Sequence, residues 1–247
     1  MFSIFKKSAK TEPQVKSGLT VDLHSHFLPG LDDGAETLEE SLEMLKGFAD
    51  FGYTKVITTP HLIHEFYKHD ENVIRERCQW MNEQLSIVGI NLVIEPAAEY
   101  FLDDHFMQRV EAEDNTFITF GKNKFLLFET PVMNEPIYLK QALFKLRMMG
   151  YNPVMAHPER YAYLQFKFDK VQELFDGGLY LQINIMSLAG YYNKVAQKLA
   201  EKLIDKDMVH FLGSDCHKPK QLQVLKDAFK TKHYQTALGL ELMNTKL

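Results

Sequence analysis

The chain has 247 residues, of which 45% are hydrophobic and 25% are charged, and its formal net charge is −5. These values are typical of a globular protein long enough to fold around one large core. The negative net charge argues against broad nucleic-acid binding. Two cysteines, Cys78 and Cys216, are too few for a disulfide scaffold and favour a reducing compartment.

Residues 1–18 are polar and basic and show no periodicity, which predicts a disordered tail before a single domain over residues 19–247. Phe2, Ile4 and Phe5 beside two lysines suggest an alternative, in which residues 1–7 contact a membrane surface or a partner. No apolar run has the length of a transmembrane segment, and the first residues do not form a signal peptide. We therefore expect a cytoplasmic protein.

From Leu19 onward, strand-like and helix-like patterns alternate. Short apolar runs predict strands near residues 20–24, 54–59, 92–98, 124–129, 153–157, 180–185 and 209–214. A helix is predicted after Thr37, a plausible N-cap with Glu40 three residues later. Further helices are expected at about 71–88, 103–112, 136–149, 169–176 and 192–206, and one or two after Lys218. This alternation predicts an α/β fold with a parallel sheet, closed into a barrel or a distorted barrel.

Metal-type side chains follow six of about seven predicted strands. They are His24, His26, His61, Glu99, Glu129, His157, Asp215 and His217. In a barrel the carboxyl ends of all strands meet at one mouth, so side chains far apart in the sequence would lie together there. His24 and His26 are two residues apart, as are Asp215 and His217, so each pair would leave the same face of an extended segment.

Asp33 lies in the turn-rich loop 29–34, whose glycines let the backbone fold back toward the same cluster. We expect Asp32, by contrast, to be a solvated loop carboxylate or a helix-start charge. Glu99 and Glu129 are well placed to bridge two cations, because an unpaired buried carboxylate is costly. Five histidines and four carboxylates without a thiolate suit two or three divalent cations such as manganese, iron, zinc or magnesium.

Several other reactive side chains receive ordinary structural roles. Cys216 would point away from the ligands beside it and be buried as a small apolar residue. Surface or packing roles are expected for His64, His69, His105, His210 and His233, with His64 the nearest of them to the mouth. Neither cysteine begins a Cys-x5-Arg loop, so the sequence excludes a cysteine-dependent phosphatase.

The motifs around these residues resemble those of the polymerase and histidinol phosphatase (PHP) superfamily of trinuclear metal phosphoesterases. The matching segments are 22–26, 58–61, 98–100, 127–129, 156–161 and 213–217, and the resemblance runs from Val21 to about Lys220. Segments 28–34 and 157–161 are most similar to the manganese-dependent protein-tyrosine phosphatases of bacterial capsule and exopolysaccharide loci, the CpsB/CapC-like and YwqE-like group. The resemblance implies a distorted (β/α)7 barrel of the PHP type and one PHP catalytic domain over residues 19–247.

Carried over by position, the resemblance implies three metal sites. The first ion would be held by His24, His26, Glu99 and Asp215. The second would be held by Glu99, Glu129 and His157, with Glu99 as the bridge. The third would be held by Asp33, His61 and His217. The implied cofactor is two or three divalent ions, foremost manganese, with iron, zinc or magnesium as alternatives.

Arg160 follows a ligand by three residues and is expected to bind the phosphate bidentately as a catalytic residue. The alternative is a surface ion pair with Glu159 or another acid. The family carries a second arginine near its last motif, where this chain offers only Lys218 and Lys220. Either lysine could replace it, as a point charge rather than a fork.

A site selective for phosphotyrosine needs depth and a wall for the ring. We expect Phe66, Tyr67 and Tyr161 to bind the ring at the mouth, with ordinary packing of the barrel rim as the alternative.

The resemblance implies a metal-dependent phosphotyrosine-protein phosphatase in which metal-activated hydroxide attacks the phosphorus. Its substrate would be a bacterial tyrosine kinase of capsule or exopolysaccharide assembly. Two alternatives stay open: a small-molecule phosphatase of histidinol-phosphate type, and a PHP nuclease or non-catalytic metal-binding regulator. The acidic net charge disfavours a nucleic-acid partner. The sequence does not indicate an oligomeric state.

Overall fold

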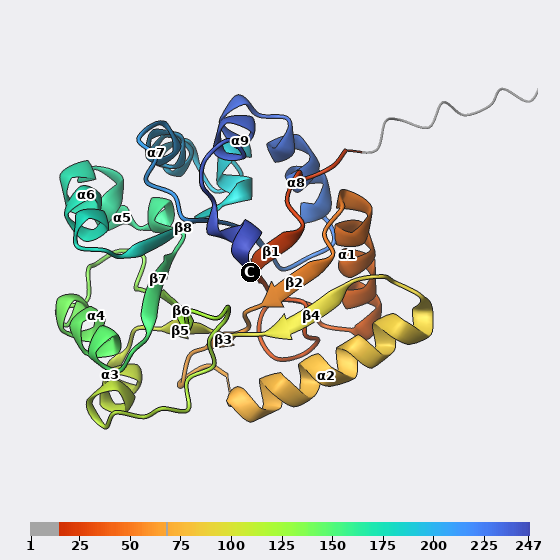
Figure 1. Cartoon of the computed structure of the whole chain (residues 1–247), viewed down its shortest axis with the longest axis horizontal. Coiled ribbons are helices and arrows are strands. Elements are labelled where there is room, and N and C mark those ends of the chain that lie inside the picture. Colours follow the sequence, from red (N-terminus) through yellow and green to blue (C-terminus); the bar gives the residue numbers. More distant parts are fainter. Residues whose placement is uncertain (1–14, 68) are drawn as a thin grey trace, which may run out of the picture.

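The computed structural model describes residues 15–67 and 69–247 (Figure 1). Within them, nine parallel strands form one sheet in the order β3-β5-β6-β7-β8-β9-β1-β2-β4. The strands are β1 (Val21–Ser25), β2 (Lys55–Thr58), β3 (His61–Leu62), β4 (Val93–Pro96), β5 (Glu99–Phe101), β6 (Phe125–Glu129), β7 (Asn152–Ala156), β8 (Tyr180–Asn184) and β9 (Phe211–Cys216).

All seven predicted strand segments form. Two of them are followed by a further short strand that was not predicted: β3 follows β2 after Thr59-Pro60, and β5 follows β4 after Ala97-Ala98. Because β2 pairs with β4 and β3 pairs with β5, these two lengthened segments lie side by side. With β1 paired to both β2 and β9, and β5 paired to β6, the seven segments close into a ring. The predicted distorted (β/α)7 barrel is confirmed.

Helices surround this ring on its outer side (Figure 1). They are α1 (Leu38–Phe51), α2 (Glu71–Val88), α3 (Asp104–Glu111), α4 (Leu139–Met148), α5 (Ala162–Gln165), α6 (Phe168–Asp176), α7 (Lys194–Asp205), α8 (Gln221–Phe229) and α9 (Lys232–Ala237). Three 3-10 turns add η1 (Pro158–Arg160), η2 (Ile185–Ala189) and η3 (Met243–Lys246). The predicted cap of α1 forms, since the Thr37 hydroxyl accepts from the backbone N–H of Glu40. Among the described residues, no helix combines the length and the apolar character needed to cross a bilayer.

Apolar side chains fill the amino-terminal half of the ring. Val21 and Leu23 of β1 pack there with Ile57, Val154 and Phe211. Met243 and Leu247, at the carboxyl end of the chain, pack against the same cluster, and the C-terminus lies near the centre of the ring in Figure 1. Because one end of the ring is filled with apolar groups, polar chemistry is confined to the other end, where the strands finish.

Most of the predicted basic tail, including residues 1–7, lies outside the described residues. Its described part is packed against the domain. Ser17 is buried, its N–H donates to the carbonyl of Phe51 at 2.9 Å, and its carbonyl accepts from the Tyr234 hydroxyl at 2.7 Å. The packed structure therefore includes residues upstream of the expected start at residue 19.

Candidate metal centre

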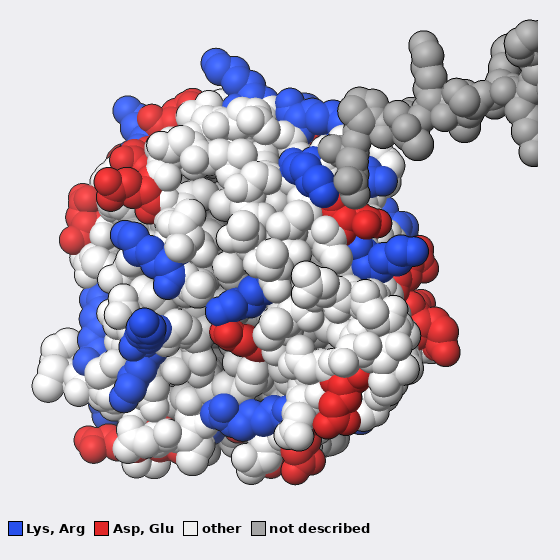
Figure 2. Space-filling view, turned by 45° about the vertical axis from the view of Figure 1, so that its right-hand side comes forward, with Lys and Arg blue, Asp and Glu red and all other residues white. Residues whose placement is uncertain are grey.

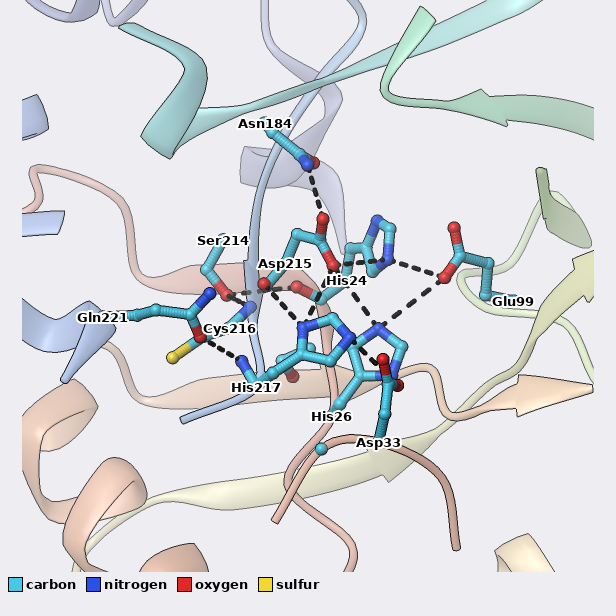
Figure 3. Close-up of polar contacts among 12 residues, drawn as sticks. His24, His26, Asp33, Glu99, Asn184, Ser214, Asp215, Cys216, His217 and Gln221 are labelled. Carbon is cyan, nitrogen blue, oxygen red and sulfur yellow. Dashed lines mark hydrogen bonds and ion pairs between the residues drawn. The ribbon is translucent and has the colours of Figure 1, made fainter. Parts of the chain in front are cut away.

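The structure brings all nine predicted ligand residues together at the carboxyl end of the ring. Figure 3 labels six of them: His24, His26, Asp33, Glu99, Asp215 and His217. In four groups, one donor atom from each member lies within 4.8 Å of the donor atoms of the others, and these groups contain the nine residues and no other described residue. The groups are His26–Asp33–His61–His217, His24–Glu99–His157, His24–His26–Asp215 and His61–Glu99–Glu129.

Three of these nine residues have a backbone conformation that was not predicted from the sequence. His24, His157 and Asp215 have φ of 80°, 34° and 51°, in the left-handed region that residues with a side chain seldom adopt. The expectation that the segments are extended is therefore wrong at His24 and Asp215, although both pairs still converge. Strained backbone of this kind persists where the surroundings enforce it, and it gathers at functional sites.

Gly34 and Gly213 allow close approach of two backbone segments near the histidines. A Cβ at Gly34 would collide with the His26 carbonyl oxygen, and one at Gly213 would collide with the Leu23 carbonyl oxygen. The loop that carries Asp33 therefore folds back on His26, as predicted. Asp33 Oδ1 lies 3.5 Å from His61 Nε2 and 3.4 Å from His217 Nε2.

Asp32 differs from its prediction, because its side chain is buried rather than solvated. Its Oδ2 lies 2.6 Å from His26 Nδ1 and also accepts a hydrogen bond from the backbone N–H of His61 at 3.0 Å. Burial alone would raise the pKa of Asp32, but His26 lowers it far below its usual range. Because a carboxylate accepts, His26 carries its proton on Nδ1 and presents Nε2 to the cluster.

The surroundings of His26 Nε2 show whether a metal ion fits this site. The atom is buried without a hydrogen-bond partner among the described residues. Its nearest acidic neighbours, Glu99 Oε2 at 3.6 Å and Asp215 Oδ1 at 3.5 Å, are beyond hydrogen-bonding distance. An orphaned imidazole nitrogen that faces two carboxylates is the donor set a divalent cation would satisfy. The residues present therefore fit the implied metal.

Glu99 has the geometry of a bridge, since its two oxygens face different histidines. Oε2 lies 3.0 Å from His24 Nε2 and 3.1 Å from His61 Nδ1, whereas Oε1 lies 2.9 Å from His157 Nε2. Glu129 lies beside His61, at 3.0 Å, and not in a group with His157 as the resemblance implied.

Electrostatics couple the carboxylates to the histidines. Burial would lower the pKa of His24, but Glu99 and Asp215 raise it to about 9. The pKa of His61 is also raised well above its usual value, against burial, by Glu99 and Glu129. Burial would raise the pKa of Glu99, which the two histidines hold well below its normal value. Protons and divalent cations would therefore compete for the same nitrogens.

Arg160 lies on η1, three residues after His157, and contacts the cluster directly. Its NH1 donates to Asp215 Oδ2 at 2.8 Å, and its guanidinium carbon lies 4.4 Å from the centroid of the Tyr192 ring. Glu159 points elsewhere: its Oε1 accepts from the backbone N–H of Asn184 and from the hydroxyl of Ser187. Glu159 is therefore not the partner of Arg160, and the acid with which Arg160 pairs is the buried Asp215.

An open pocket of about 430 Å³ lies over the cluster. Arg160 is the one lysine or arginine that lines it among the described residues. Lys218 is instead paired with Glu36, at 2.6 Å, and Lys220 is an exposed residue at the start of α8. The apolar part of the wall consists of Ile63, Tyr67, Phe101, Tyr191 and Tyr192.

The three aromatic residues predicted to bind the ring have different surroundings. Tyr67 lines the pocket and lies parallel to His61, with the ring centroids 6.1 Å apart. Phe66 is 76% exposed and does not line the pocket. Tyr161 is fully buried and its hydroxyl accepts from the Thr130 N–H, so its prediction as a mouth residue is wrong. It packs beneath His157 instead of beside the pocket.

The sequence argument missed Phe101, Tyr191 and Tyr192. Phe101 follows Glu99 by two residues on β5, so strand periodicity could have placed it on the same side. The two tyrosines follow η2, in a loop that carries no comparable pattern.

Residues expected to play structural roles lie outside the nine-residue set. The Cys216 thiol is buried, 3.8 Å from the Met44 sulfur and directed away from the histidine rings (Figure 3). His64 stacks on His105 with the ring centroids 4.0 Å apart. His69, His210 and His233 are also absent from the four groups.

The face shown in Figure 2 carries no continuous basic stripe. On the face shown in Figure 2, lysine and arginine side chains are scattered with acidic side chains among them. A nuclease would be expected to present a continuous basic stripe to the phosphate backbone.

A ring of parallel strands that gathers these imidazoles and carboxylates at one end defines a metal-binding α/β barrel of the PHP type. The chain belongs to the CpsB/CapC family, described as "Capsular polysaccharide synthesis, CpsB/CapC", whose model matches residues 20–235.

Three comparisons with individual proteins agree with this assignment. The chain is 32% identical to CapC of Staphylococcus aureus, over 92% of this chain and 90% of CapC. It is 30% identical to the tyrosine-protein phosphatase YwqE of Bacillus subtilis, over 81% of this chain and 78% of YwqE. Among solved structures, a chain from the crystal structures of YwqE and of CpsB from Streptococcus pneumoniae, "unique metal-dependent tyrosine phosphatases", matches with a TM-score of 0.76 at 29% identity, covering 88% of this chain and 84% of the other.

Proposed function

We propose that this chain is a metal-dependent phosphotyrosine-protein phosphatase, with residues 19–247 as one catalytic domain. The observation that carries the proposal is the convergence of nine imidazole and carboxylate ligands with Arg160 at one pocket. The tyrosine-protein phosphatase names of YwqE and CpsB support the same activity. The proposed substrate is therefore a protein that carries phosphotyrosine.

The proposed ligands are His24, His26, Asp33, His61, Glu99, Glu129, His157, Asp215 and His217. We propose two or three ions, with manganese as the native metal, because the donors are nitrogen and oxygen atoms without a thiolate. When bound, such cations neutralise phosphate oxygens and lower the pKa of water toward neutrality, which supplies a hydroxide nucleophile.

The side chains of the chain itself would bind and orient the substrate. Arg160 is held on one edge by Asp215 and on one face by Tyr192, and Asp215 is the only described residue that accepts from its guanidinium. Its other N–H groups are therefore available to phosphate oxygens. Ile63, Tyr67 and Phe101 would pack against the phenyl ring, which a serine phosphate lacks.

We further propose that the substrate is a tyrosine kinase of capsule or exopolysaccharide assembly, in the cytoplasm. The description of the family as one of capsular polysaccharide synthesis supports the pathway. The two unpaired, buried cysteines support a reducing compartment.

A substrate panel tests the proposal. Manganese-loaded protein is assayed with a phosphotyrosine peptide, its phosphoserine counterpart and histidinol phosphate. We expect the highest kcat/KM for the phosphotyrosine peptide, because its phenyl ring would pack against the apolar wall of the pocket. Faster turnover of histidinol phosphate would instead identify a small-molecule phosphatase, and no turnover of any of the three would reject the phosphatase assignment.

A further inference from the structure

Strand β8 carries none of the nine proposed ligands, yet it sends two amide side chains into the cluster. Gln182 and Asn184 are two residues apart on this strand, and both are fully buried. Gln182 Nε2 donates to Asn184 Oδ1 at 2.9 Å. The pair lies between His24 on β1 and Asp215 on β9, which are members of the same metal group.

At one end of this chain of hydrogen bonds, Asp215 uses its two oxygens differently. Oδ2 accepts from Asn184 Nδ2 at 2.6 Å, from the Tyr192 hydroxyl at 2.9 Å and from Arg160 NH1 at 2.8 Å. The contact with Asn184 is visible in Figure 3. Oδ1 faces histidine nitrogens instead, at 3.4 Å from His24 Nε2 and 3.5 Å from His26 Nε2. Three donors on Oδ2 therefore leave Oδ1 as the ligand atom.

In each hydrogen bond of the chain between Asp215 and His24, the donor and the acceptor can be assigned by starting from the Asp215 carboxylate. Because a carboxylate only accepts, Asn184 must turn its NH₂ toward Asp215 and its oxygen toward Gln182. Gln182 must then donate to that oxygen and present its own oxygen to His24 Nδ1, 2.8 Å away. His24 consequently carries its proton on Nδ1 and offers Nε2 to a metal.

We infer that Gln182, Asn184 and Tyr192 are positioning residues of the metal site formed by His24, His26 and Asp215: they fix the tautomer of His24 and the orientation of Asp215. The inference rests on the proposed metal centre and not on the identity of the substrate. Strand β8, which carries no proposed ligand, would thus contribute to metal binding through Gln182 and Asn184.

Manganese binding to the full-length chain tests the inference without an activity assay. Gln182→Leu and Asn184→Leu each break the chain of hydrogen bonds between Asp215 and His24. Tyr192→Phe removes one donor to Asp215 Oδ2 but keeps the ring beside Arg160. Removal of such hydrogen-bond partners typically weakens metal affinity by about 10–100-fold, and we expect this range for the two leucine variants. Tyr192→Phe should show a smaller loss, because two donors to Oδ2 remain.

Tyr180→Phe is the matched control, because Tyr180 lies on the same strand at its amino-terminal end and packs against the apolar interior of the ring. Its affinity for manganese should equal that of the wild type. The tautomer provides a second readout: in the zinc-loaded protein, ¹⁵N spectra should show the Nδ1–H form of His24, and Gln182→Leu should perturb it.

Wild-type manganese affinity in folded Gln182→Leu and Asn184→Leu proteins would overturn the inference. If those two variants fail to fold, wild-type affinity in Tyr192→Phe would overturn it. If the variants lose affinity while the wild-type protein hydrolyses no phosphate ester, the inference stands and the proposed phosphatase function fails.

Discussion

At the scale of single residues, two acidic ligand candidates, Glu99 and Asp215, differ in what their oxygens contact. Both oxygens of Glu99 face histidines, whereas Asp215 presents one oxygen to histidines and the other to three donors. Glu99 therefore has the contacts of a bridge between two cations, and Asp215 those of a ligand to one.

Glu99→Gln should lower the metal content by more than one ion per chain and abolish turnover, because one neutral amide replaces a ligand shared by two sites. Elemental analysis of the purified protein measures the content. Glu95→Gln is the control, since Glu95 pairs with Lys55 outside the cluster. Full metal stoichiometry in Glu99→Gln would show that Glu99 does not bridge.

Arg160→Ala should keep most of its metal and lose kcat/KM by an amount worth about 2–4 kcal/mol, the range for one charged contact to a transition state. Arg160→Lys should recover only part of that loss, because an ammonium group cannot bind phosphate as a fork. Arg75→Ala, at an exposed position of α2, controls for loss of positive charge. Wild-type kinetics in Arg160→Ala would remove Arg160 from the site.

Tyr67→Ala should lower kcat/KM for a phosphotyrosine peptide more than for a phosphoserine peptide, because Tyr67 lines the pocket where the ring would pack. Phe66→Ala, the substitution of its exposed neighbour, should have the smaller effect. Kinetic comparison of the two variants on both peptides decides the point. Equal losses on both peptides would mean that Tyr67 does not recognise the ring.

At the scale of elements, the sequence predicted the strands and helices well because apolar periodicity determines them. The seven segments and the cap at Thr37 all form. The short strands β3 and β5 were not predicted, and neither were the left-handed conformations of His24, His157 and Asp215. These features depend on contacts between strands, which a local pattern does not contain.

The difference between local patterns and contacts between strands also explains which site residues were predicted correctly. Eight of the nine ligand candidates lie at or near strand ends, and parallel strands end at one mouth, whereas Asp33 reaches the cluster through the loop that folds back on His26. Tyr161 was misplaced because its side chain packs inward against His157, and Asp32 because the sequence does not show that His26 Nδ1 and the His61 backbone N–H face its carboxylate. Gln182 and Asn184 of β8 were not picked out as site residues from the sequence, because glutamine and asparagine also occur in many strands that have no functional role.

At the scale of the whole molecule, the cluster links stability to pH. In the metal-free protein the pKa of His24 rises from 6.5 to about 9, because Glu99 and Asp215 outweigh the effect of burial. A raised folded-state pKa stabilises the fold fully below the unfolded value and ceases to do so as pH rises through the folded value. The metal-free Tm should therefore fall between pH 6.5 and 9.

Manganese should oppose this loss, because the cation replaces the departing protons and binds more tightly as they leave. Thermal unfolding followed by circular dichroism, with chelator and with manganese, measures both trends. A metal-free Tm that rises across this interval would show that the histidines are not held protonated by the carboxylates.

A titration with manganese tests the central claim most directly. Chelated protein is reloaded stepwise, and bound metal and phosphotyrosine hydrolysis are measured in the same samples, with and without iodoacetamide. We predict that activity is absent without metal, rises with occupancy to two or three ions per chain, and survives alkylation because both cysteines are buried outside the cluster. Activity that persists after complete removal of metal, or that alkylation abolishes, would contradict the account.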